Sequence, residues 1–206
     1  IVGAAAGLST ALYLYNVSYF FQFSGPQIAV TAIFVFFSPG VAMWLAPKLG
    51  LTLGKKQTAI LAICGAIGLY PIPYLGTLSG FWPEAGSSAS LYIYSFFVFA
   101  EVVGFIVGGV MLDSMMADIV EDSEVKTNRR SEGLFYAARS FAAKAVSALG
   151  IILAGSIVTM VGLDGIKEAT EMTAEMRVDL ATFFLPLYCG LYFLAIYLVS
   201  KYRIDR

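Results

Sequence analysis

The chain has 206 residues, of which 59% are hydrophobic and only 13% are charged, and its formal net charge is −1. A soluble domain carries about 25% charged residues, so this chain has too few charges to cover a surface that faces water. Without a basic excess it has no electrostatic means of holding nucleic acid, and without histidine it has no His-ligated metal site and no Ser–His catalysis.

Six apolar runs are long enough to cross a membrane, which takes about 20 mostly apolar residues. They predict an all-α membrane protein of six transmembrane helices, at approximately 1–23, 27–46, 57–78, 90–117, 134–161 and 180–200. Pro47 ends the second run, and Pro71 and Pro73 bend the outer end of the third. Because Ile1 already lies inside an apolar run, we expect the start to be cut from a longer chain.

The connections between the runs alternate in charge. Nine Lys and Arg residues fall in the second and fourth connections and after the sixth run, whereas the other connections hold only Lys167 and Arg177. Basic residues mark the cytoplasmic side, so we expect the chain to enter from the cytoplasm and return there. The link 162–179 is outside and is predicted to form a short surface helix.

Three Gly-x-x-x-Gly spacings allow two helices to approach closely. They are Gly3/Gly7, Gly76/Gly80 and Gly104/Gly108, and with 20 glycines in the chain some of these spacings arise by chance.

Only the fourth and fifth runs carry charged residues in their interiors: Glu101, Asp113, Arg139 and Lys144. An ionised side chain at mid-helix costs about 2.5–3.5 kcal/mol. The charge-free third and sixth helices are therefore expected to face lipid, and the fourth and fifth to face protein or water.

Two ion pairs suggest themselves, Glu101–Lys144 near the midplane and Asp113–Arg139 nearer the cytoplasm. At 100° per residue, Asp113 is rotated about its helix by about 120° from Glu101, and Arg139 by about 140° from Lys144, in the same sense. Two straight helices that face each other would therefore bring at most one pair into direct contact. The charges either line a polar passage or are packing pairs that fix helix register.

The inner part of the first run is polar and aromatic. Asn16 and Tyr19 are three residues apart and would share one face of an α-helix. They are candidates for contacting a polar solute, with interhelical hydrogen bonding and an interfacial aromatic belt as the alternative.

The stretch 114–133 resembles the signature loop of the glycoside–pentoside–hexuronide:cation symporters, the melibiose-carrier-like branch of the major facilitator superfamily. The matching residues are Ala117, Asp118, Glu121, Glu124, Lys126, Arg129, Arg130, Glu132 and Gly133. The helix that follows also looks like that family, with Lys144 at the place of its central lysine. The loop is more acidic here, at Asp122, than in many members.

The resemblance implies that the chain is the C-terminal half (helices 7–12) of the superfamily fold, built as two inverted three-helix repeats, with the N-terminal six-helix half missing. Its first and fourth helices would line a central cavity, the second and fifth would flank it, and the third and sixth would face lipid.

The function implied is cation-coupled symport of a sugar or related polar solute by alternating access, in a multi-pass carrier of the bacterial inner membrane. Lys144, Glu101, Asn16 and Tyr19 would lie at the cavity. A cytoplasmic gate would comprise Asp113, Asp118, Glu121, Glu124, Arg129, Arg130, Glu132 and Arg139. The partners would be membrane lipid, the missing half and the sugar. The coupling cation, Na⁺ or H⁺, would bind chiefly to carboxylates of the missing half, with no other cofactor.

A different class of function is a membrane assembly subunit whose buried ion pairs only fix the choice of partner. An enzyme is disfavoured, because the sequence offers no nucleophile–base constellation and no metal-ligand cluster.

Overall fold

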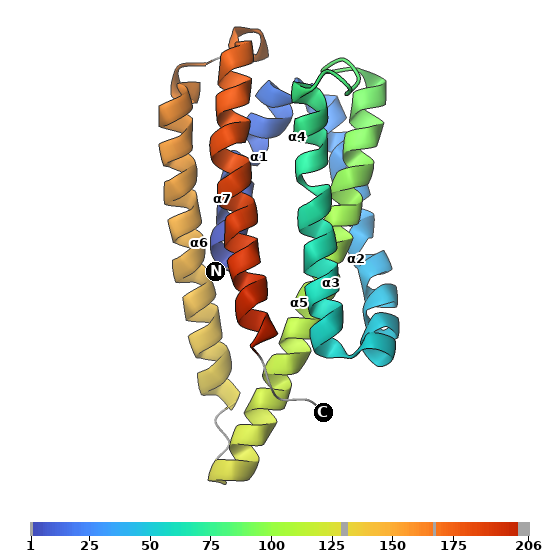
Figure 1. Ribbon diagram of the computed structural model, residues 1–206, viewed down its shortest axis with the longest axis vertical. Helices are drawn as coiled ribbons and strands as arrows, with labels where there is room; N and C mark the ends of the chain where they lie inside the picture. Colours follow the sequence, from blue (N-terminus) through green and yellow to red (C-terminus); the bar gives the residue numbers. More distant parts are fainter. Residues whose placement is uncertain (1, 129–131, 167, 202–206) are drawn as a thin grey trace.

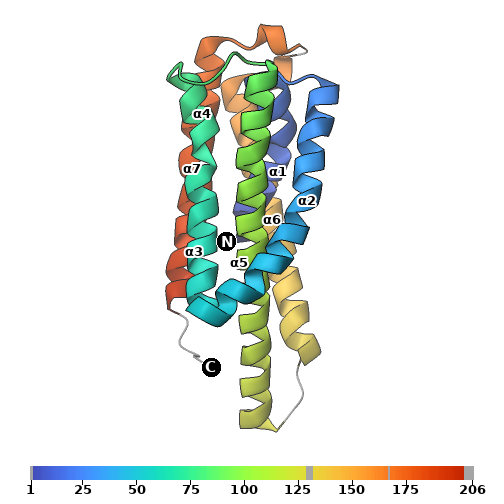
Figure 2. The ribbon, with the colours of Figure 1, turned by 90° about the vertical axis from the view of Figure 1, so that its right-hand side faces the viewer.

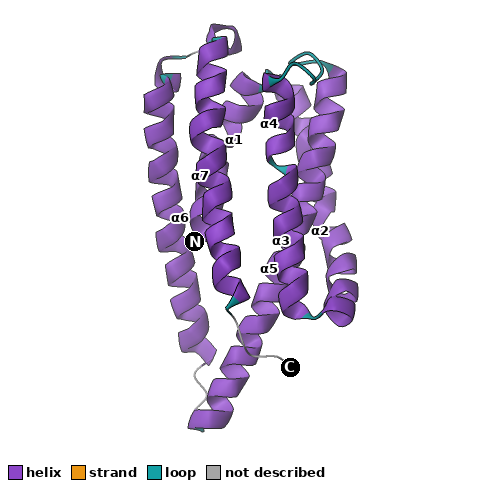
Figure 3. Ribbon diagram, in the orientation of Figure 1, coloured by secondary structure: helices purple, strands orange, loops and turns teal. Residues whose placement is uncertain are grey.

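The structure is a computed structural model that describes residues 2–128, 132–166 and 168–201, and within them it contains helices and loops but no strand (Figure 3). The helices are α1 (Val2–Tyr15), the π-helix η1 (Asn16–Phe20), α2 (Gly25–Leu53), α3 (Lys55–Leu69), α4 (Pro71–Leu78), α5 (Ser88–Thr127), α6 (Glu132–Val161), the 3₁₀ turns η2 (Leu163–Gly165) and η3 (Ala169–Glu171), and α7 (Ala174–Ser200). The predicted all-α fold is confirmed.

Five of the six predicted runs form helices that are long and apolar enough to cross a membrane: α2, α3 with α4, α5, α6 and α7. The first run forms α1, which has only 14 residues, and continues as the five residues of η1. At 1.5 Å per residue α1 measures about 21 Å, less than the hydrocarbon thickness of about 30 Å.

Local sequence explains where several helices begin. Ser24 and Gln27 form a capping box at the start of α2, next to Pro26. The hydroxyl groups of Ser87 and Thr173 accept hydrogen bonds from the third residues of α5 and α7. Each cap satisfies backbone N–H groups that have no partner inside the helix.

Three predicted boundaries were wrong. α2 continues through Pro47 to Leu53, because proline is tolerated in membrane helices when neighbouring elements satisfy the freed backbone groups. α5 extends ten residues beyond 117 and ends at Thr127, followed by Asn128 in the left-handed backbone conformation of a C-cap. The acidic loop is therefore mostly helical. The outer link forms two 3₁₀ turns rather than one helix.

The helices form two groups that lie side by side (Figures 1 and 2). α1, α6 and α7 make one group, and α2, α3–α4 and α5 make the other. α1 packs along α6, α2 and α3 pack along α5, and α7 contacts α1, α3 and α6. The first helix of each predicted three-helix repeat thus packs on the second helix of the other, as two related repeats would. The charge-free third and sixth runs, α3–α4 and α7, contact each other.

The connections predicted to be cytoplasmic gather at one end of the bundle. The turn after α2, the end of α5, the start of α6 and the end of α7 lie at the bottom of Figure 1, where α5 projects beyond the other helices. The link 79–87, η2 and η3 lie at the top. The alternating charge of the connections therefore corresponds to two ends of one bundle.

Two of the three Gly-x-x-x-Gly spacings lie at helix crossings. A Cβ atom on Gly3 would lie 2.8 Å from the carbonyl oxygen of Ala143, and one on Gly7 would overlap Ser147, so this pair seats α1 against α6. Gly104 and Gly108 seat α5 against α3 in the same way. Gly76 instead faces Trp82, and Gly80 is a loop residue with a φ of 75°.

We expect Gly150→Ala to destabilise the protein by at least about 2 kcal/mol, because the added methyl group would overlap the carbonyl oxygen of Ala4 on α1. Thermal unfolding in detergent, followed by size-exclusion chromatography, measures the loss. Gly155→Ala is the control on the same helix, since nothing lies within 4 Å of its Cβ position. Equal stability of the two variants would contradict the close α1–α6 crossing.

Candidate functional site

The four charges at membrane depth occupy three separate places. The guanidinium of Arg139 on α6 pairs with the carboxylate of Asp113 on α5. Glu101 is buried inside the bundle, whereas Lys144 is exposed on α6. The Glu101–Lys144 pair does not form, so one direct pair is present, as the helix rotation predicted.

Glu101 faces α7 and the α3–α4 break instead of α6. The hydroxyl of Tyr188 on α7 donates a hydrogen bond to Oε1 of Glu101 at 3.0 Å. The ring of Tyr70 stacks on Tyr188 with centroids 4.1 Å apart, and the hydroxyl groups of Tyr70 and Tyr74 are 3.3 Å apart. These contacts join three elements, α5, α7 and the α3–α4 break, around one carboxylate.

A small cavity of about 10 Å³, enough for about one water molecule, opens beside this carboxylate at the α3–α4 break. Its lining comes from α3, α4 and α5, and consists of Leu69, Tyr70, Pro73, Tyr74, Tyr94, Phe97, Val98 and Glu101. Pro71 and Pro73 cause the break, because neither has an N–H group to continue the hydrogen bonding of α3. Glu101 is the only acidic residue in this lining.

Asn16 and Tyr19 do not share one exposed face. Both lie in η1, where the wider i→i+5 turn replaces the α-helical spacing on which the prediction rested. Asn16 is 1% exposed, and within the described part of the chain neither amide atom has a hydrogen-bond partner. Tyr19 is half-buried against Tyr15, with ring centroids 5.9 Å apart.

The predicted cytoplasmic gate residues contact several elements. Asp118 on α5 forms an ion pair with Lys55 at the start of α3, with distances of 2.8 and 2.7 Å from Nζ to its two carboxylate oxygens. Lys126 pairs with Asp122 one turn away, at 2.7 Å. Glu121, Glu124 and Glu132 are exposed near the ends of α5 and α6, and Arg129 and Arg130 lie outside the described residues.

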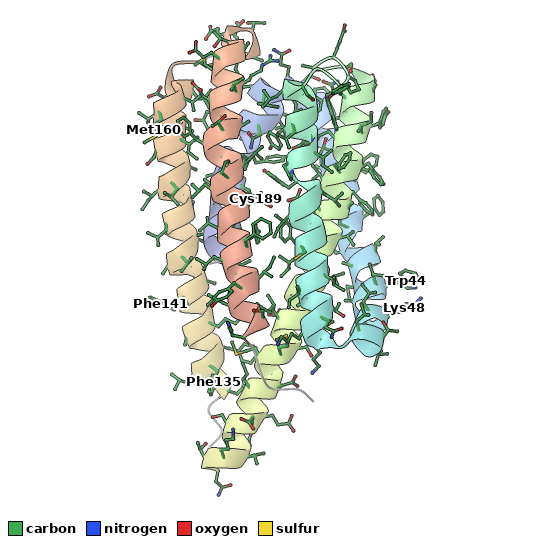
Figure 4. All side chains as sticks on the ribbon, viewed as in Figure 1. Trp44, Lys48, Phe135, Phe141, Met160 and Cys189 are labelled. Carbon is green, nitrogen blue, oxygen red and sulfur yellow. The ribbon has the colours of Figure 1, made fainter. Side chains whose placement is uncertain are left out.

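Lys144 lies beside the stripe that seats α6 on α1. Ala143, the residue before it, touches Gly3, and Ser147, three residues after it, touches Gly7. Lys144 is rotated by roughly a quarter turn from this stripe, toward the uncovered face that also carries Phe141, labelled at the outer flank in Figure 4. The Lys144 side chain is therefore exposed among the described residues.

Sequence reasoning missed Tyr188, Tyr70 and Lys55. No sequence pattern singles out either tyrosine, although Pro71 and Pro73, which bend the third run, lie beside Tyr70. Lys55 was counted among the basic residues of the cytoplasmic side, and its three-dimensional partner Asp118 lies 63 residues away.

The described residues contain no group of three or more acidic or cysteine side chains that could hold a metal ion. The protein-family model described as MFS/sugar transport protein matches residues 1–206 of this chain. No curated protein and no solved structure matches the chain.

We expect Tyr188→Phe to cost about 1–3 kcal/mol of stability, because it removes the hydrogen bond of a buried carboxylate and leaves the ring in place. Tyr197→Phe is the matched control on α7, since Tyr197 is 58% exposed. Unfolding of both variants in detergent gives the comparison. A Tyr188→Phe variant as stable as the control would mean that the bond to Glu101 contributes nothing.

The Lys55–Asp118 pair is expected to contribute about 0.5–1 kcal/mol, a modest value because the Lys55 side chain is 35% exposed. A double-mutant cycle with Lys55→Gln and Asp118→Asn measures the coupling, which should shrink at high salt. The matched cycle of Lys126→Gln and Asp122→Asn, at an ion pair in which the Lys126 side chain is 71% exposed, should give a smaller value. Additive effects at Lys55 and Asp118 would refute the link between α3 and α5.

Proposed function

Because this chain belongs to the MFS/sugar transport protein family, whose model matches all of residues 1–206, we propose that it is the second half of a cation-coupled sugar symporter that works by alternating access. Family membership makes it a multi-pass membrane protein of sugar transport and not an enzyme. The symport mechanism, the coupling cation and the place of this half within the carrier belong to the proposal.

Lys144 carries the proposal. It lies 12 residues into the 30-residue helix α6, about 18 Å from the start of that helix. Its side chain is exposed in this bundle although the surrounding helix is apolar. Since a cation against acyl chains is costly, we infer that Lys144 borders a polar passage in the complete carrier.

The proposal also includes a cytoplasmic gate. The Asp113–Arg139 pair connects α5 to α6, and the Asp118–Lys55 pair connects α5 to α3. We propose that these contacts favour the outward-facing state by holding the cytoplasmic ends of the helices together. The exposed residues Glu121, Glu124 and Glu132, with Arg129 and Arg130, would add a contribution that salt screens.

In this proposal Asn16 and Tyr19 contribute to the sugar site from η1. A π-helical turn with an unsatisfied buried amide is a place where helix conformation can change at low cost. A shift of η1 toward α-helical geometry would bring Asn16 and Tyr19 to one face. The amide of Asn16 would then gain a partner on the sugar.

The uncovered faces of the bundle indicate what surrounds it in the complete carrier. Large apolar side chains are exposed on α2, including Phe36 and Met43, and Trp44 and Lys48 form a cation–π contact of 3.6 Å at its flank (Figure 4). We propose that lipid and a further six-helix half cover these surfaces. A bacterial inner membrane and Na⁺ or H⁺ as the coupling ion complete the proposal, with no role for nucleic acid.

Lys144→Ala in the complete carrier tests the proposal. We expect sugar-dependent uptake to fall at least tenfold, because the passage loses its midplane cation, while the amount of folded protein in the membrane is unchanged. Radiolabelled sugar uptake in vesicles measures this, and Lys48→Ala, at the exposed flank of α2, serves as the matched control.

Unchanged uptake by the Lys144→Ala carrier would remove Lys144 from the mechanism. Loss of folded protein, with no effect on transport per molecule, would give Lys144 a structural role. The second candidate function is a membrane assembly subunit, in which buried charges only fix packing. The Asp113–Arg139 pair is the observation that this second candidate explains equally well.

A further inference from the structure

Two lysine–aromatic pairs lie on the outside of the bundle, one near the end of α2 and one at the end of α7. Nζ of Lys48 lies 3.6 Å from the centroid of the Trp44 ring, and Nζ of Lys201 lies 5.0 Å from that of Tyr197. Both aromatic residues are well exposed, Trp44 at 62% and Tyr197 at 58%. Figure 4 shows Trp44 and Lys48 projecting from the flank of the bundle.

The two pairs have the same orientation along the bundle. In each, the aromatic residue comes four positions before the lysine, so the two side chains share one face of the chain. α2 and α7 both run toward the predicted cytoplasmic end, at the bottom of Figure 1. The ring of each pair is therefore about 6 Å deeper in the membrane than the lysine that follows it.

Both lysines lie at the depth of the predicted cytoplasmic membrane surface. α2 begins at Gly25, so Lys48 lies about 35 Å along this helix. The apolar part of α7 begins at Leu180, and Lys201 follows about 32 Å later. Because the hydrocarbon is about 30 Å thick, each ammonium group reaches the headgroup region, whereas its ring stays at the edge of the hydrocarbon.

Neither lysine has a negative partner in the described part of the chain. Positions 1–83 contain no Asp or Glu, and no described acidic side chain pairs with Lys48 or Lys201. Asp118 of α5, at the same end of the bundle, is engaged with Lys55. Because a cation–π contact leaves the charge of a lysine in place, each ammonium group can attract an anion from outside the bundle.

We propose that the two pairs bind anionic phospholipids of the cytoplasmic leaflet. The ammonium group meets the lipid phosphate, and the ring packs along the glycerol and the first acyl carbons. A free phosphate ion has no apolar part to place on the ring. A zwitterionic lipid carries its own cation beside the phosphate, so an anionic headgroup is favoured. The proposal names the lipid at these two positions and does not depend on what the carrier transports.

The test is lipid binding to the purified complete carrier, titrated with phosphatidylglycerol or with phosphatidylcholine of the same acyl chains and counted by native mass spectrometry. We expect at least two phosphatidylglycerol molecules to bind about fivefold more tightly than phosphatidylcholine, since one lysine near an anionic surface contributes about that factor. Lys48→Gln and Lys201→Gln should each lower this number by one, and the double variant by two. Trp44→Leu should weaken one site about twofold, because the cation–π contact that positions Lys48 is lost.

Lys126→Gln is the matched control. Lys126 lies about 57 Å along α5, beyond a membrane of about 40–45 Å with its headgroups, so this variant should bind as many phosphatidylglycerol molecules as the wild type. Equal affinity for the two lipids, or a double variant that keeps the wild-type number, would refute the sites. Displacement of the lipid by inorganic phosphate would mean that they bind a free ion.

Folding does not limit this test, because both lysines are exposed and the two single variants decide if the double variant cannot be purified. No sugar is present in the titration. Failure of the lipid sites therefore leaves the transport proposal standing, and unchanged uptake by the Lys144→Ala carrier leaves the lipid sites standing.

Discussion

A bilayer offers no water to an ionised side chain, and this constraint accounts for where each charge of the chain lies. Asp113 and Arg139 neutralise each other between α5 and α6. Glu101 turns inward to a tyrosine hydroxyl. Among the described residues Lys144 has neither solution, and it lies on an uncovered face. Three charges are thus accommodated by the fold of this bundle, and we propose that the fourth meets a polar surface outside it.

Two buried polar features at membrane depth lie beside interruptions of the helices. η1 holds the buried amide of Asn16, and the α3–α4 break adjoins the cavity of Glu101. An unbroken membrane helix uses all its backbone hydrogen bonds internally and offers nothing to a polar ligand. A π-turn or a proline pair frees backbone groups locally, so the two interruptions are where this otherwise apolar bundle can bind or respond.

Close packing at the glycine crossings makes these arrangements possible. Gly3, Gly7 and Gly150 bring the backbones of α1 and α6 together, and Gly104 and Gly108 do the same for α5 and α3. Because lipid provides little hydrophobic drive for helix association, such small-residue contacts supply much of the attraction. They also fix the rotation of α5, and this rotation directs Glu101 toward α7 and away from Lys144.

The sequence alone determined the membrane environment, the apolar segments, the two ends of the bundle and the identity of the charges at depth, because these depend on composition and on the length of local runs. It also predicted that the two charge pairs could not both form, since helix rotation is a local property. Only the tertiary structure decided that Tyr188 is the partner of Glu101, that Lys55 binds Asp118 and that Asn16 is buried. Those outcomes depend on how each helix turns about its own axis, and this is set by packing against helices far away in the chain.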